Sequence, residues 1–158
     1  MSKEDHEKQL KDYISSKSTR IFSNSNRELY DLLIKVVFST ANTINWMVSN
    51  PEKTKSFLVG ENFDIIKKYI ESGKSLSLIL IGNFDSIKSN YDNLKLNNSN
   101  FKFKLIDKKI NVQDVFTWDN IGYRFTPDQH KLTGVACAND PEFTAKCNNI
   151  FNKINELI

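Results

Sequence analysis

The sequence SLSLILIG, residues 75–82, decides the fold of this chain. Its uninterrupted apolar run from Leu78 to Ile81 is typical of a central β-strand that is covered on both faces. A helical pattern ends at Gly73, just before it, and small polar residues follow it. A strand of this kind needs covering layers on both sides of its sheet, which indicates an α/β protein.

Helical and extended patterns alternate on both sides of this strand. Before it, the pattern predicts a polar helix at 2–18, a strand at 20–23, a helix opened by a Ser25–Glu28 capping box, a strand at 43–48, a short helix opened by Asn50-Pro51-Glu52, and a helix at about 61–72. After it, the pattern predicts a helix at about 84–94, strands at 101–107, 114–120, 122–126 and 132–138, and a final helix capped by Asp140.

This order predicts an α/β fold with a mixed sheet. Crossover helices between the early strands give a parallel β-α-β half, and the short connections after residue 107 give an antiparallel meander, followed by a C-terminal helix. The length of 158 residues suits one domain. We assign residues 19–158 to that domain and residues 1–18 to an N-terminal helical extension.

Composition narrows the function classes. The chain has 22 Lys and Arg against 19 Asp and Glu, a net charge of +3, which is too mild to argue for nucleic acid. No apolar run approaches the roughly 20 residues of a membrane span, and the charged N-terminus predicts no secretory signal. The two cysteines, Cys137 and Cys147, fit neither a disulfide framework nor a four-ligand zinc site. We therefore expect a cytoplasmic protein without membrane, metal or cofactor.

Small polar residues follow the predicted parallel strands. They are Asn24, Asn26, Asn50 and Asn83. The carboxyl ends of such strands meet at one edge, where open α/β sheets bind ligands. Helices begin directly after them, so free backbone amides would make this edge an anion-binding rim. The alternative is that these residues only cap helices.

The predicted meander holds a second group of candidate residues. Arg124 lies in a strand and would need a carboxylate if it faces inward, with Asp119 as its partner or with a ligand role for the pair. His130 could act as an acid or base, although the preceding Pro127-Asp128 turn favours an exposed loop position. Trp118, just before the turn, is expected to be partly exposed, where it could stack on a ligand or a partner.

The segments FKFKLIDKKINVQDVFTWDNIGYRF (101–125) and ACANDPEFTAKCNNIF (136–151) resemble a phospholipase D-like domain in its single-half form. That family's catalytic signature is HxKxxxxD, with a nucleophilic histidine and a phosphate-binding lysine. Its spacing places the histidine on Val112, the lysine on Asp114 and the aspartate on Asp119. The resemblance therefore implies a degenerate member without the catalytic histidine and lysine. Single halves of this family commonly pair face to face, which implies a homodimer.

Three hypotheses about function follow. The first, which we favour, is a non-catalytic binding, sensing or regulatory module that acts through a ligand or partner at the vestigial active-site edge. The second is a phosphodiesterase or nuclease that uses Asp119, His130 and Arg124, which would have to converge in one pocket. The third is a protein-interaction subunit that docks through the stripe of Leu10, Tyr13 and Ile14. Nucleic-acid binding ranks behind these three.

Overall fold

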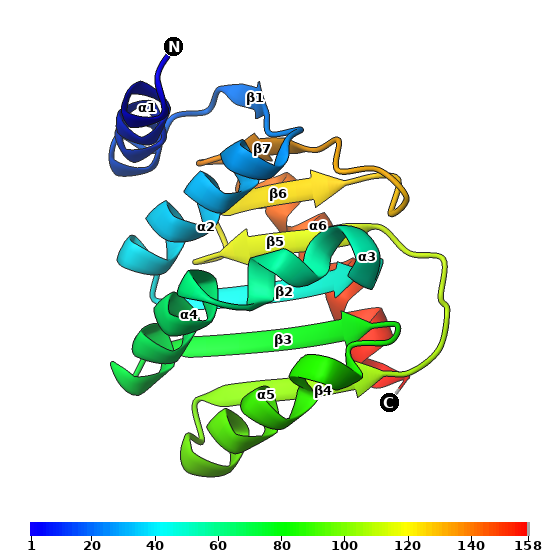
Figure 1. Cartoon of the computed structure of the whole chain (residues 1–158). Coiled ribbons are helices and arrows are strands. Elements are labelled where there is room, and N and C mark those ends of the chain that lie inside the picture. The colour runs from blue at the N-terminus through cyan, green and yellow to red at the C-terminus, as the bar shows by residue number, and fades with distance from the viewer. Residues whose placement is uncertain (158) are drawn as a thin grey trace.

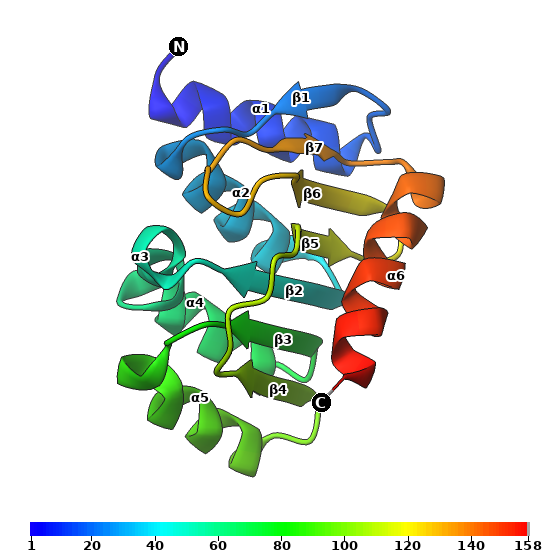
Figure 2. The ribbon, with the colours of Figure 1, turned by 90° about the vertical axis from the view of Figure 1, so that its right-hand side faces the viewer.

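The computed structural model describes residues 1–157 and shows a seven-stranded sheet between two helical layers (Figure 1). Ile158 lies outside the described residues. The helices are α1 (Lys3–Ser15), α2 (Arg27–Thr40), α3 (Pro51–Thr54), the 3-10 helix η1 (Lys55–Leu58), α4 (Glu61–Glu71), α5 (Asp85–Asn97) and α6 (Pro141–Glu156). Helices α2 to α5 cover one face, and α6 crosses the other (Figure 2).

The sheet is mixed, with the strand order β1-β7-β6-β5-β2-β3-β4. The strands are β1 (Ile21–Ser23), β2 (Thr43–Ser49), β3 (Ser75–Ile81), β4 (Phe101–Ile106), β5 (Asp114–Trp118), β6 (Gly122–Thr126) and β7 (Val135–Cys137). β2, β3 and β4 are parallel, whereas β5, β6, β7 and β1 follow as antiparallel neighbours beginning at β2. The α/β class, the mixed sheet and the meander beside the parallel half are confirmed.

The central strand β3 is buried on both faces, as its apolar run predicts. Leu78 and Leu80 belong to the large core under α2, α4 and α5, while Ile79 and Ile81 belong to a smaller core under α6. Successive side chains of a strand point to opposite faces, so an unbroken apolar run fills both cores at once. Trp46 on the neighbouring strand β2 is fully buried in the larger core.

The first strand, β1, does not lie beside the parallel strands, although its order in the chain predicts that position. It pairs with β7 at the far edge, through Phe22 opposite Ala136, rather than with β2. Following the antiparallel steps across the sheet, β1 still points in the direction of β2. Three strands separate the two, which at about 4.8 Å per strand moves the end of β1 about 19 Å from the end of β2.

The start of α2 is capped by Asn26 rather than by the predicted Ser25–Glu28 box. The Asn26 side chain accepts a hydrogen bond from the backbone N–H of Leu29 (2.9 Å). The Ser25 hydroxyl instead donates to the carbonyl of Gly134 (3.2 Å), in the segment that leads into β7. Pairing of β1 with β7 brings this segment close, so the tertiary contact takes Ser25 away from the cap.

The apolar stripe of α1 is covered by its own chain, which corrects its assignment as a docking surface. Leu10 is 5% exposed and belongs to the large core, and Ile14 packs against the same core. The ring of Tyr13 lies 5.2 Å from that of Phe22 on β1. A stripe that already fills a groove of the same domain cannot also enter a partner's groove.

Trp118 is also buried, at 3% exposure, so it is not a partner-facing side chain. It ends β5 directly opposite Gly122. A Cβ atom built on Gly122 would lie 2.1 Å from the Trp118 indole, so the ring occupies the space that a side chain would need. The absence of a side chain at position 122 therefore lets the indole fold into the core.

Candidate functional site

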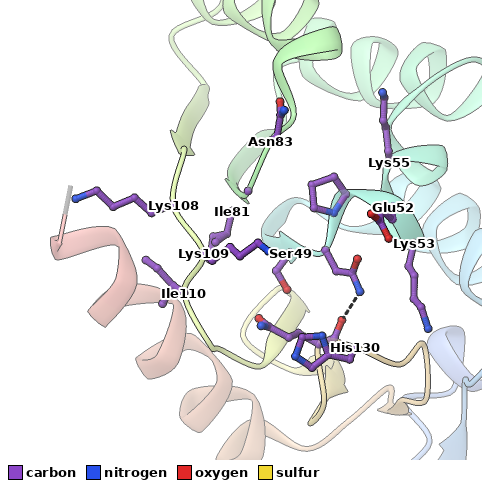
Figure 3. A pocket seen from close by; sticks show the side chains of 14 residues that line it. Ser49, Glu52, Lys53, Lys55, Ile81, Asn83, Lys108, Lys109, Ile110 and His130 are labelled. Carbon is purple, nitrogen blue, oxygen red and sulfur yellow. Dashed lines mark hydrogen bonds between the residues drawn. The ribbon is translucent and has the colours of Figure 1, made fainter.

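A cavity of about 700 Å³ opens at the carboxyl ends of β2 and β3 (Figure 3). Four segments contribute to it: the β2–α3 junction, the β3–α5 turn, the segment after β4 and the loop between β6 and β7. Its lining residues are Ser49, Asn50, Pro51, Glu52, Lys53, Lys55, Ile81, Gly82, Asn83, Lys108, Lys109, Ile110, Gln129 and His130. Open α/β sheets place their ligand sites at this edge, and the volume lies in the range of small-molecule sites.

The two strand ends are shaped by unusual backbone conformations. Asn50 adopts a left-handed conformation (φ 58°), and its side chain does not cap α3. Its amide instead donates to the carbonyl of Gln129 (2.9 Å) and so ties the β6–β7 loop to β2. Gly82 has φ 117°, and a Cβ there would lie 3.0 Å from a ring carbon of Pro51. The turn after β3 therefore needs glycine to pass this close to α3.

The cavity floor rests on a buried carboxylate. Asp114, the first residue of β5, is 7% exposed. The Ser49 hydroxyl donates to one of its oxygens (2.5 Å), and the Ser49 N–H donates to both (3.2 Å each). Burial raises the pKa of Asp114 to about 6, and the hydrogen bonds from Ser49 and the charge of Arg124 act in the opposite direction. The floor thus carries a carboxyl group whose pKa lies above its ordinary value.

The charged side chains in the cavity walls are mainly cationic. Lysines enter the lining from two sides: Lys53 and Lys55 follow β2, and Lys108 and Lys109 follow β4. Glu52 is the carboxylate in the lining. His130 lies on the β6–β7 loop, where its backbone N–H donates to the carboxylate of Asp128 (2.9 Å). It is exposed, as the turn pattern predicts, and it lines the cavity.

The residues of the predicted rim therefore do not all lie together. Asn50, Asn83 and His130 meet at the cavity. Asn26 caps α2, and Asn24 is buried inside the protein. The rim prediction placed all these strand ends side by side, but three strands of the meander lie between β1 and β2.

Arg124 and Asn24 form a buried structural cluster instead of a ligand site. Arg124 is 2% exposed. Its guanidinium donates to the side chain of Asn24 (2.7 Å) and to that of Thr126 (2.6 Å), and to two backbone carbonyls, those of Asn24 and Leu132 (2.8 Å each). It also lies over the ring of Tyr30, 3.7 Å from the centroid. Burial lowers the pKa of Arg124 from its ordinary value.

Asp119 is not the partner of Arg124. It occupies the β5–β6 turn with φ 53°, and its carboxylate accepts from the backbone N–H groups of Asn42 and Thr43 (2.9 Å each). These residues start β2, whereas the cavity lies at the end of β2. Seven residues of strand span about 20 Å, so Asp119 lies at the opposite edge of the sheet from His130. The catalytic set of Asp119, His130 and Arg124 therefore does not converge.

The three positions matched to HxKxxxxD are also dispersed. The Val112 N–H donates to the side-chain carbonyl of Gln129 (3.2 Å), next to the cavity. Asp114 lies beneath the floor, and Asp119 follows the far end of β5. The first two positions lie near the cavity, but neither carries the family's residue there.

Sequence reasoning missed most of the charged lining. Lys53, Lys55, Lys108, Lys109 and Gln129 were not among the candidates. A signal was present, because the two lysine pairs follow two strands of the predicted parallel half within a few residues. The small net charge of the whole chain conceals this local excess, because a total does not show where the charges lie.

The described chain also provides two observations, on metal binding and on membrane-spanning helices. Among residues 1–157, no three or more His, Cys, Asp or Glu side chains cluster in a way that could hold a metal ion. Every helix in the same range is too short or too polar to cross a bilayer. Cys137 and Cys147 are buried free thiols.

Comparison with known proteins gives a likeness in structure alone. No protein-family model matches the chain, and no curated protein sequence matches it significantly. The fold is similar to that of TrmBL2, described as an archaeal chromatin protein with a novel mode of DNA binding, with a TM-score of 0.65 at 14% sequence identity. The match covers 96% of this chain and 58% of TrmBL2, so the chain spans somewhat more than half the length of that protein.

Proposed function

We propose that this chain is a non-catalytic binding module whose ligand occupies the cavity at the carboxyl ends of β2 and β3. The observation that carries the proposal is the cavity itself, at the edge where α/β sheets bind ligands. Its lining joins four separate segments, so a bound ligand would stabilise their arrangement. Such coupling between a ligand and several loops is what a sensing or regulatory module requires.

The phospholipase D-like resemblance supports the same proposal. Val112 stands where that family has its nucleophilic histidine, and valine cannot attack phosphorus. Asp114 stands where the family has its phosphate-binding lysine, and its carboxylate is engaged by Ser49 beneath the floor. We propose that the edge keeps a binding role after the loss of the catalytic pair.

Nucleic-acid binding is a second candidate function. The fold similarity to TrmBL2, whose description includes DNA binding, and the lysines around the cavity favour it. Anisotropy of a fluorescently labelled DNA duplex, measured at two salt concentrations, tests it. Binding through phosphates should weaken steeply as salt rises. Absence of binding at the lower salt concentration contradicts this candidate.

A homodimer is part of the proposal because single halves of the resembled family pair. Light scattering coupled to size-exclusion chromatography measures the mass directly. A species of twice the chain mass, stable on dilution, supports pairing, and a monomer at all concentrations removes it.

The binding function is tested by filling the cavity. Asn83 is exposed and lines the cavity, so Asn83→Trp should occupy it without disturbing the core. Asn93→Trp, at an exposed position further along α5, is the matched control. We expect members of a panel of sugars, nucleotides and amino acids to raise the melting temperature of the wild type and of Asn93→Trp but not of Asn83→Trp.

The catalytic alternative is tested with bis(p-nitrophenyl) phosphate, a generic phosphodiester. We expect no turnover by the wild-type chain. Turnover that disappears in His130→Ala, while the variant remains folded by circular dichroism, would replace the binding proposal with an enzymatic one.

A further inference from the structure

The cavity carries an excess of positive charge that has no carboxylate partner among residues 1–157. Four lysines line it against one glutamate. The ion-paired lysines of residues 1–157 are Lys11, Lys35 and Lys88, on α1, α2 and α5. None of the four cavity lysines therefore has a carboxylate partner among these residues. Ammonium groups gathered around a concave surface create a positive potential that low-dielectric walls strengthen.

One of these lysines reaches the interior of the cavity. Figure 3 shows Lys109 extending across it toward Ser49, while Lys53, Lys55 and Lys108 extend outward from the rim. His130 lies on the side of the cavity opposite Asn83. A small anion beside Lys109 would lie in reach of the one inward ammonium, and the outer lysines would strengthen the attraction.

The remaining lining suits the body of a small polar molecule. Ile81, Ile110 and Pro51 provide apolar surface. The side-chain oxygen of Asn83 accepts a hydrogen bond from the backbone N–H of Asp85 (3.2 Å). Its amide hydrogens form no hydrogen bond within residues 1–157, so they are available to a ligand. The volume of about 700 Å³ is much larger than one phosphate group needs. The space therefore fits a phosphate together with an attached organic group.

We propose that the cavity binds a small phosphorylated metabolite, with its phosphate at Lys109 and its polar body against Asn83 and the apolar wall. This inference rests on the proposed binding function and adds the chemical class of the ligand. It commits to a small molecule rather than a duplex because the inward ammonium lines a cavity of ligand size. Specific DNA binding, in contrast, spreads its contacts over about 1,000 Å² or more of protein surface.

Ribose 5-phosphate and ribose form a matched pair of probes, because they share a polar body and differ in the phosphate. Titration calorimetry measures both affinities, and ¹H–¹⁵N NMR spectra locate binding through the signals of Asn83, Gly82 and Gln129. We expect ribose 5-phosphate to bind at least tenfold more tightly than ribose, since a phosphate adds charge-assisted hydrogen bonds. Its affinity should fall as salt rises.

Two exposed positions give variants with opposite expected effects. Lys109→Gln should weaken ribose 5-phosphate binding about tenfold, because one charge-assisted contact is lost. Glu52→Gln should tighten it about threefold, because a nearby repulsive charge is removed. Lys67→Gln, an exposed site on α4 outside the cavity lining, is the control and should leave the affinity unchanged. A purely structural role for these side chains would not give effects of opposite sign.

The outcomes separate this inference from the binding function. Equal binding of ribose and ribose 5-phosphate at the cavity overturns the phosphate assignment and leaves the binding function standing. Binding of a DNA duplex that Lys109→Gln weakens, without binding of ribose 5-phosphate, overturns the small-molecule assignment. If neither sugar nor inorganic phosphate shifts the NMR signals of the cavity residues, the phosphate assignment fails. If the panel used with Asn83→Trp also gives no stabilisation, the binding function fails with it.

Discussion

At the scale of single residues, the surroundings of a buried charged group decide whether it can still bind a ligand or change its protonation state. Arg124 and Asp114 both lie inside the protein, on neighbouring strands, yet each is held by neutral groups rather than by the other. Arg124 uses four of its five N–H donors on two side chains and two carbonyls inside the protein. Asp114 keeps an ionisable carboxyl directly under the cavity. The difference makes Arg124 a structural residue and Asp114 a pH-sensitive one.

The raised pKa of Asp114 predicts how stability depends on pH. Its pKa is about 6 in the folded chain, against an ordinary value of 3.8. An acid whose pKa is raised by folding favours the folded state at low pH. Its contribution is complete below pH 3.8 and is lost as the pH rises through 6. A shift of this size corresponds to about 3 kcal/mol.

Replacing this carboxyl checks the prediction. Urea unfolding between pH 4 and pH 7 should show that the wild-type chain loses about 2 kcal/mol more than Asp114→Asn, since part of the full effect lies below pH 4. Asp107→Asn, which alters an exposed carboxylate, should behave as the wild type does. Parallel stability curves for the wild type and Asp114→Asn would show that the carboxyl has an ordinary pKa.

At the scale of elements, the width of a helix's apolar face bears on how that helix packs. The faces of α4 and α6 are broad and pack against the sheet, with Ile66 and Ile70 of α4 in the larger core and Phe151 of α6 in the smaller one. The stripe of α1 is narrow, which suggested an extension that waits for a partner. The structure shows that a narrow stripe is enough to pack α1 onto the domain, because α1 lies at the end of the helical layer and contacts α2 and β1 there. The Glu7–Lys35 ion pair (2.8 Å) adds a polar contact to α2.

The packing of α1 predicts a stability effect for Leu10→Ala. Removing a buried leucine side chain should lower the free energy of unfolding by about 2 to 3 kcal/mol. Lys8→Ala, on the exposed side of the same helix, should change it by less than about 0.5 kcal/mol. Chemical denaturation measures both. A Leu10→Ala variant as stable as Lys8→Ala would mean that α1 does not rest on the domain in solution.

At the scale of the whole molecule, the sheet ends in two open edges, β1 and β4. Edge strands expose unpaired backbone groups that can pair with another chain. β1 is short, with three residues, whereas β4 has six and carries Lys102 and Lys104 between apolar neighbours. Charged side chains of this kind oppose edge-to-edge pairing. The exposed Lys102 is thus a protective feature of the longer edge.

Lys102→Val should therefore promote association beyond that of the wild-type chain. Light scattering over a concentration series should show larger species for this variant. Lys67→Val, which makes the same change at an exposed position on α4, controls for the loss of charge. Equal masses for the two variants at every concentration would contradict a protective role for Lys102.

The sequence by itself determined the α/β class, the order of the elements and the double burial of β3. These properties follow from apolar periodicity, which is local. Tertiary structure alone decided that β1 pairs with β7, that Asp119 lies at the edge opposite His130, and that lysines from two separate segments surround one cavity. Strand pairing joins residues far apart in the chain, and its partners are chosen by the packing of the whole sheet. No local pattern around Asn24, Asp119 or Lys109 could therefore show which of them would meet.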